Sequence, residues 1–117
     1  MSYSSFQAAS GQAAPGGAQQ RLDCNFHTLT TGIAPRHSDT VDVKFMIDGR
    51  AVVVALPHKA FAEFKKTSGR PLTDREAIDA AGYILKALIE RGQWSSEAEY
   101  RPDQQETAAA IQAVAMR

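Results

Sequence analysis

Cysteine and histidine are the residue types in this sequence that could supply nucleophilic or acid–base chemistry. The chain has one cysteine, Cys24, and the histidines His27 and His37 follow it in the sequence. A thiol becomes a strong nucleophile when a neighbouring imidazole takes its proton. One hypothesis is therefore a small enzyme or ligand-binding protein that uses Cys24 with His27 or His37. The competing interpretation is a core residue, because a single cysteine on the apolar side of a strand usually packs as a small hydrophobic group.

The spacing of the histidines is not that of a metal site. Zinc ligands typically recur as Cys-x-x-Cys or as two histidines one helical turn apart, and neither pattern occurs among the three histidines and the cysteine. The carboxylates have structural explanations, since Asp48 suits a turn and Asp74 and Glu76 suit the start of a helix. We therefore expect no catalytic carboxylate, no metal site and no cofactor.

Basic side chains gather in residues 57–72, where one acidic residue opposes them, although the whole chain has a formal net charge of +0. These basic residues are Lys59, Lys65, Lys66 and Arg70. A second hypothesis is therefore a nucleic-acid-binding protein that uses the basic segment 59–70. Two observations oppose it: a general nucleic-acid binder normally has a larger basic excess, and the acidic start of the next helix repels phosphate.

The single tryptophan, Trp94, is a further candidate contact residue. Tryptophan is enriched at the energetic centres of protein interfaces. Trp94 could equally close one edge of the core, because it follows the main predicted helix. The sequence leaves both interpretations open.

The elements that must position these residues begin with a β-hairpin over residues 40–56. Apolar and polar residues alternate up to Asp48-Gly49, a pair that favours a two-residue type I′ turn because both positions need positive φ. Such a turn predicts four pairs on one face of the hairpin, three of them apolar on both sides. The predicted pairs are Ile47 with Arg50, Phe45 with Val52, Val43 with Val54, and Val41 with Leu56.

The N-terminal part of the chain divides into a predicted tail and a predicted strand. Residues 1–21 are rich in Ser, Gly, Ala and Gln, and such a segment buries too little apolar surface to offset the entropy of ordering. We therefore expect a disordered tail there. Residues 22–27 alternate between apolar and polar side chains, which predicts a half-buried strand. Residues 30–39 contain glycine and proline and are expected to form a loop.

Three helices are predicted in the C-terminal half. The first spans residues 57–67 and begins at Pro57. The second begins at Thr73, where Thr73-Asp74-Arg75-Glu76 matches a capping box, and runs to Gly92. The third covers about residues 102–116, and its alanine-rich sequence has a weak apolar stripe, so we expect fraying unless this helix docks on the body or on another chain.

These elements predict a small two-layer α+β domain over residues 22–117, in which an antiparallel hairpin of two to three strands packs against two to three helices. The expected core contains the large apolar residues of the hairpin and of the helical stripes. Its members are Phe26, Val41, Val43, Phe45, Val52, Val54, Leu56, Phe61, Phe64, Ile78, Ala81, Leu85 and Leu88.

The leading functional hypothesis is a non-enzymatic interaction or regulatory accessory module of a bacterial type. A small sheet has edges that must be covered, and the outer hairpin face and the terminal helix offer further apolar surface, so we expect a protein partner or self-association. No segment approaches the roughly 20 apolar residues of a membrane span, and residues 1–20 lack the parts of a signal peptide. One cysteine excludes an intrachain disulfide, which suits a reducing compartment, and the expected location is the cytoplasm.

Overall fold

A five-stranded mixed sheet packs against three helices in the computed structural model of the chain, which describes residues 5–13, 19–31, 40–93 and 99–115. The strands are β1 (Ser5–Ala13), β2 (Gln19–Thr31), β3 (Thr40–Ile47), β4 (Arg50–Pro57) and β5 (Glu99–Tyr100). The helices are α1 (His58–Ser68), α2 (Asp74–Glu90) and α3 (Gln104–Ala115). The predicted α+β class is therefore confirmed, with more strands than the expected two to three.

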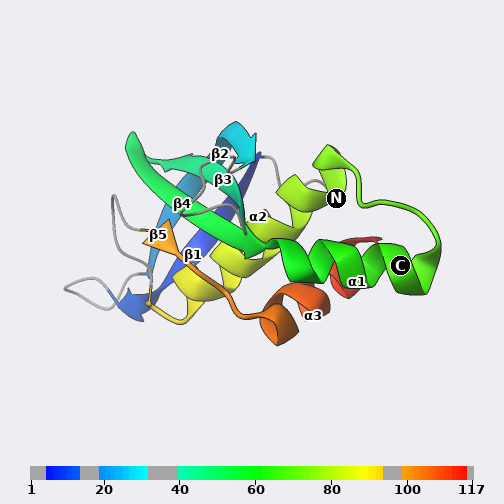
Figure 1. The fold of residues 1–117 in the computed structure, drawn as a ribbon. Helices are drawn as coiled ribbons and strands as arrows, with labels where there is room; N and C mark the ends of the chain where they lie inside the picture. The colour runs from blue at the N-terminus through cyan, green and yellow to red at the C-terminus, as the bar shows by residue number, and fades with distance from the viewer. Residues whose placement is uncertain (1–4, 14–18, 32–39, 94–98, 116–117) are drawn as a thin grey trace.

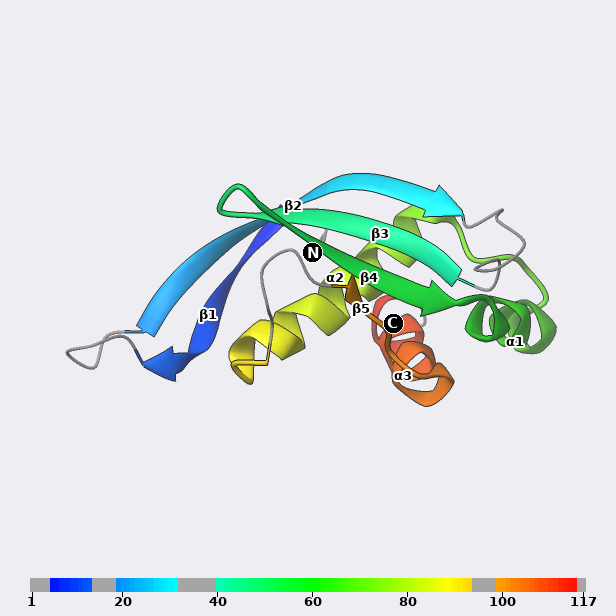
Figure 2. The same ribbon diagram turned by 60° about the vertical axis from the view of Figure 1, so that its left-hand side comes forward.

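The sheet follows the order of the chain, β1-β2-β3-β4-β5. The first four strands pair antiparallel with their neighbours, and β5 pairs parallel to β4. Figure 2 shows the sheet above α2 and α3, with α1 continuing from the end of β4. This arrangement places the described helices against one face of the sheet.

The β3–β4 hairpin has the register that the sequence predicts. Phe45 pairs with Val52 and Val43 with Val54, and Ile47 faces Arg50 across the turn. The turn residues Asp48 and Gly49 have φ values of 49° and 83°, as a type I′ turn requires. The alternation of side chains therefore places one apolar row of each strand toward the helices.

The expectation of a disordered tail over residues 1–21 is wrong for residues 5–13, which form β1, and for residues 19–21, which begin β2. The strand is held by non-local contacts that composition does not reveal. Ala8 is buried, and the ring of Phe6 packs edge-on against Phe45 with centroids 6.1 Å apart. Pairing with β2 satisfies backbone groups of a segment that is poor in large apolar residues.

Strand β2 is also longer than the predicted strand over residues 22–27. Phe26 pairs with Phe45 and Thr28 with Lys44, so His27 is the extra residue of a β-bulge. The bulge changes the period-two pattern at that point, and the strand continues to Thr31 into the segment that we expected to be a loop. The rest of that predicted loop, residues 32–39, lies outside the described residues.

Local capping signals set the ends of the helices. Helix α1 ends at Gly69, whose φ is 78° and whose N–H donates to the Lys65 carbonyl at 2.9 Å. At the start of α2 the Thr73 hydroxyl accepts from the Glu76 N–H, and the Glu76 carboxylate accepts from the Thr73 N–H, both at 3.1 Å. The predicted capping box is therefore confirmed.

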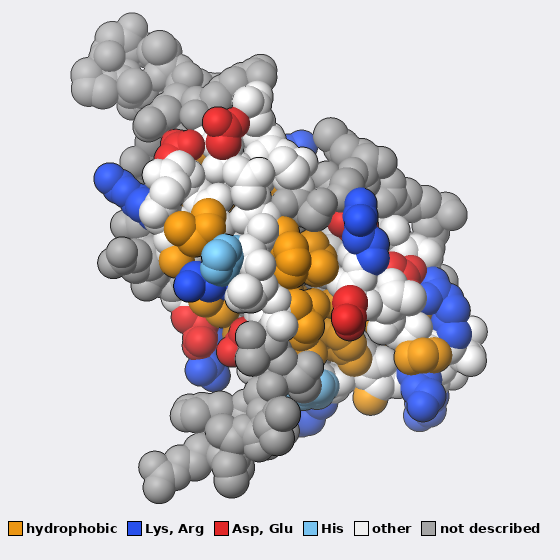
Figure 3. All heavy atoms as spheres, turned by 90° about the horizontal axis from the view of Figure 1, so that it is seen from above, with side chains coloured by type: hydrophobic (Ala, Val, Ile, Leu, Met, Phe, Trp, Pro, Cys, Tyr) orange, Lys and Arg blue, Asp and Glu red, His pale blue; other side chains and the backbone are white. Residues whose placement is uncertain are grey.

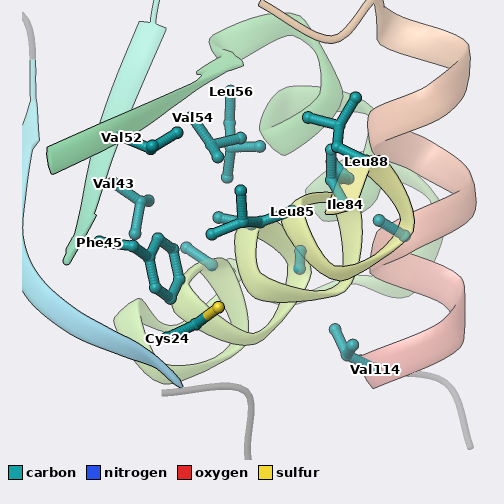
Figure 4. Close-up of a cluster of buried hydrophobic side chains, with 14 of the residues drawn as sticks. Cys24, Val43, Phe45, Val52, Val54, Leu56, Ile84, Leu85, Leu88 and Val114 are labelled. Atoms are coloured by element: carbon teal, nitrogen blue, oxygen red, sulfur yellow. The ribbon is translucent and has the colours of Figure 1, made fainter. Parts of the chain in front are cut away.

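The core lies between the sheet and α2, as Figure 4 shows. Leu85 of α2 points toward Phe45 and Val54 of the hairpin, and all three side chains are fully buried. Of the predicted core, Phe26, Phe61 and Ile78 are only half-buried at its margin. The predicted list also omits residues that the structure buries, among them Ile47, Ile84 and Ile89.

Candidate functional site

A groove separates α1 from α3 and encloses about 210 Å³. Figure 1 shows the two helices near each other at the end of the molecule where β4 runs into α1. Helix α1 contributes four residues with the i, i+3, i+4, i+7 spacing of one face, and α3 contributes three with the same kind of spacing. The lining residues are Ala60, Glu63, Phe64 and Thr67 of α1 and Ala108, Ile111 and Gln112 of α3.

The floor of this groove is apolar and its rim is polar. Ala60, Phe64 and Ile111 form the floor and are 2%, 5% and 2% exposed. The hollow exists because alanine occupies positions on both walls where a larger side chain would close it. A cavity of about 150 Å³ lined by apolar residues accepts benzene, so this groove is large enough for one aromatic or branched aliphatic side chain.

An ion pair between Arg70 and Glu76 joins the end of α1 to the first turn of α2. The Arg70 guanidinium makes two hydrogen bonds of 2.8 Å to the Glu76 carboxylate and lies 5.1 Å from the centroid of the Phe64 ring. The hydrogen bonds from Arg70, with further ones from Thr73, hold the pKa of Glu76 at about 2. The end of α1, the start of α2 and the groove floor are therefore fixed relative to one another.

The four predicted basic residues do not share one surface. Arg70 is bound to Glu76, and Lys65 lies on the side of α1 away from the groove, by its helical spacing from Phe64. Lys59 and Lys66 are exposed and lie on the same side of α1 as Glu63. Nucleic-acid binding by residues 59–70 stays a prediction, and this arrangement divides the charge that it would use.

Cys24 and His27 do not meet in the described structure. Cys24 is 1% exposed and belongs to the core, whereas the bulged His27 is exposed. Burial, with smaller contributions from the charges of Asp48 and Asp23, raises the pKa of the Cys24 thiol to about 12. A thiol with this pKa is almost fully protonated at neutral pH and is a poor nucleophile. His37 and Trp94 lie outside the described residues.

The described part of the chain was also searched for metal sites and for membrane-spanning helices. Within it, no three side chains of His, Cys, Asp or Glu gather as the ligands of a metal ion. Among the described helices, none combines the length and the apolar character that crossing a bilayer requires.

The outer face of the sheet is a second surface with apolar character. Met46, Ala51 and Val53 are half-buried there, beside Asp42 and Lys44. Figure 3 shows this face, with apolar side chains gathered near its centre and charged side chains around them. Ala55 belongs to the same row and is buried, so this face is partly exposed at Met46, Ala51 and Val53 and covered at Ala55.

The groove residues were missed in the sequence because no single segment defines them. The weak apolar stripe that the sequence indicates on the terminal helix consists of Ala109, Ile111, Val114 and Met116. In the structure Ile111 and Val114 of this stripe are buried, Ala109 is exposed, and Met116 lies outside the described residues. The available signal was the small side chains at Ala60 and Ala108 within apolar stripes.

No protein-family model, curated protein or solved structure matches this chain. The geometry of the described residues is therefore the basis for a functional proposal.

Proposed function

We propose that this protein is a non-catalytic protein-binding module that receives an apolar side chain of its partner in the α1–α3 groove. The observation that supports the proposal is the 210 Å³ hollow with an apolar floor and a polar rim. Helical partners commonly place one large apolar side chain in such a groove between two helices. At the rim the Thr67 hydroxyl, which donates within its own helix, can accept a hydrogen bond, and the Gln112 amide can both donate and accept.

The charge around the groove favours a partner with acidic residues. Glu63 is the charged residue among those that line the groove, and Lys59 and Lys66 flank it along α1 outside the lining, so this side of α1 has one net positive charge. The opposite wall is neutral, since residues 107–116 contain no charged side chain. The complementary partner is an amphipathic segment in which Asp or Glu flanks a large apolar residue, because opposite charges steer the encounter and fix the orientation.

A peptide display experiment with two matched variants tests this proposal. Ala108→Trp places an indole in the groove, whereas Ala109→Trp places the same group on the exposed side of the same helix. A random peptide display library is selected on the wild-type protein, and the enriched peptides are measured on both variants. We expect peptides with an aromatic or leucine residue between acidic residues, with binding lost in Ala108→Trp and retained in Ala109→Trp.

Charge reversal provides the second arm of the experiment. The double variant Lys59→Glu, Lys66→Glu should weaken the selected acidic peptides, and the loss should shrink at high salt because exposed charges are then screened. Peptides that bind Ala108→Trp as well as the wild type would place their site elsewhere. Enrichment of basic or uncharged peptides would contradict the partner chemistry proposed here.

A further inference from the structure

The α1 wall of the groove presents hydrogen-bond acceptors to a partner. The Thr67 hydroxyl lies 3.0 Å from the Glu63 carbonyl oxygen and 3.3 Å from the Phe64 carbonyl oxygen, and it must donate because a carbonyl has no proton. The hydroxyl oxygen is then left as an acceptor. The side chain of Glu63 on the same wall is a carboxylate, which can only accept. Both polar side chains of the α1 lining are therefore acceptors toward a partner.

The Glu63 carboxylate has no partner among the described residues. It takes part in none of the side-chain hydrogen bonds and ion pairs of that part of the chain. Glu63 is exposed, so water solvates its carboxylate in the free protein. A side chain that fills the groove displaces some of this water. Since an acceptor that loses water without gaining a hydrogen bond costs free energy, the best occupant is one that donates to Glu63.

The floor of the groove suits a flat and large apolar group. Ala60, Phe64 and Ile111 close it toward the interior and are buried. The Arg70 guanidinium lies 5.1 Å from the centroid of the Phe64 ring and supports that ring. A cavity of about 150 Å³ accepts benzene, so the 210 Å³ of the groove leave room for a second fused ring. The floor is therefore large enough for an indole.

The charge beside the groove favours a neutral donor over a cationic one. Lys59 and Lys66 flank Glu63 along α1, so this side of the helix has one net positive charge, which disfavours an entering lysine or arginine. Leucine and phenylalanine bring no donor, and the tyrosine hydroxyl is both a donor and an acceptor. The indole of tryptophan is large, apolar and neutral, and its N–H only donates. Tryptophan therefore complements both the apolar floor and the accepting wall.

We infer that the partner side chain in the α1–α3 groove is a tryptophan, with its rings on the apolar floor and its indole N–H donating to the Glu63 carboxylate. The Thr67 hydroxyl, one turn further along α1, is the second acceptor on the same wall. This inference rests on the proposed function, because it names which apolar residue the partner supplies. It makes Glu63 the residue that distinguishes tryptophan from other apolar side chains.

A titration with small tryptophan analogues, followed by nuclear magnetic resonance, tests the inference. The probes are N-acetyl-tryptophanamide and the analogue in which a sulfur atom replaces the indole N–H, which keeps the ring shape and removes the donor. Both should shift the backbone amide signals of Ala60 and Ala108. We expect the tryptophan derivative to bind the wild-type protein roughly three- to tenfold more tightly than its sulfur analogue. N-acetyl-leucinamide should bind more weakly than the tryptophan derivative.

Two matched alanine variants identify the acceptor. In Glu63→Ala the two ring analogues should bind equally, whereas Glu90→Ala, which removes an exposed glutamate of α2, should keep the wild-type preference. Both glutamates are exposed helical residues and alanine favours helix, so both variants are expected to fold. The preference is a ratio of dissociation constants within one variant, so a change in groove shape affects both analogues alike.

The outcomes separate this inference from the proposed function. Equal binding of the two ring analogues to the wild type would overturn the inference, as would a preference that Glu63→Ala keeps or tighter binding of N-acetyl-leucinamide. In each of these cases apolar probes still bind in the groove, so the proposed function stands. If no probe shifts the signals of Ala60 and Ala108, the groove does not receive apolar side chains and both proposals fall.

Discussion

The contact between α2 and the sheet differs from the contact between α1 and α3, although both are built from aliphatic side chains, alanines and a phenylalanine. Between α2 and the sheet, Leu85 fills the space against Phe45 and Val54, and all three are fully buried. Between α1 and α3, alanines leave a hollow of about 210 Å³. Close packing is what a stable core needs, so the difference separates the part that holds the fold from the part where we propose that a partner binds.

Helix α1 is joined to α2 at one end and borders the groove along one face. Its C-terminal end is fixed to α2 by Arg70 and Glu76, and the same arginine lies on the ring of Phe64. One face of α1, which contains Ala60 and Phe64, lines the hollow between α1 and α3. A helix that is anchored at one end can bound an unfilled groove without closing over it, which is what a preformed binding groove requires.

The largest effect on the free energy of unfolding is expected when a side chain is removed from the close-packed contact between α2 and the sheet. Leu85→Ala should lower the free energy of unfolding by about 3–5 kcal/mol, because it removes a fully buried side chain from a packed site. Urea unfolding monitored by circular dichroism measures the change. Leu85→Met is the control and should cost less than about 1.5 kcal/mol, since the volume is nearly kept. A loss below about 1 kcal/mol for Leu85→Ala would show that this contact is not well packed.

An intermediate effect on the free energy of unfolding is expected when an alanine is replaced by leucine in each of the two contacts. Ala81→Leu inserts a larger side chain where the structure leaves the alanine fully buried, and overpacking should cost about 1–3 kcal/mol. Ala108→Leu inserts the same side chain into the groove, where the space exists, and should change the stability by less than about 1 kcal/mol. Thermal and urea unfolding compare the two variants. Equal losses would remove the distinction between a filled and a hollow contact.

The smallest effect is expected from the pH dependence of the anchor between α1 and α2. The pKa of Glu76 is about 2 in the folded protein against an ordinary value of 4.5. A carboxyl with a lowered pKa stabilises the fold above its ordinary pKa, and this contribution is lost as the pH falls from about 4.5 toward 2. Because the pair is partly exposed, we expect a loss of about 1 kcal/mol.

Urea unfolding at a series of pH values measures this contribution. The variant Glu76→Gln cannot ionise at this position, so its stability should fall less than that of the wild type over the same acid range. Glu90→Gln is the matched control, since Glu90 is an exposed glutamate at the other end of the same helix. Parallel pH profiles for the wild type and Glu76→Gln would show that the Arg70–Glu76 pair does not stabilise the fold.

Local signals were sufficient for the central hairpin and for the start of α2. Asp48-Gly49 fixed the turn, the alternation of β3 and β4 fixed which row is buried, and the Thr73–Glu76 pair fixed the helix start. Strand β1 could not be predicted in this way, because its stabilising partners are Phe45 and the backbone of β2, which are distant in the sequence. The period-two pattern was also broken at His27, where one inserted residue shifts the pairing.

The sequence by itself determined the α+β class, the hairpin register and the main helix, because turn chemistry, side-chain period and capping each act within a few residues. The tertiary structure alone decided where Cys24, the basic residues and the groove lie. A cysteine becomes unreactive through burial among distant residues, lysines and arginines form one patch or several according to helix orientation, and a hollow exists only where two separate helices meet. These outcomes depend on the packing of elements and not on the propensity of any one of them.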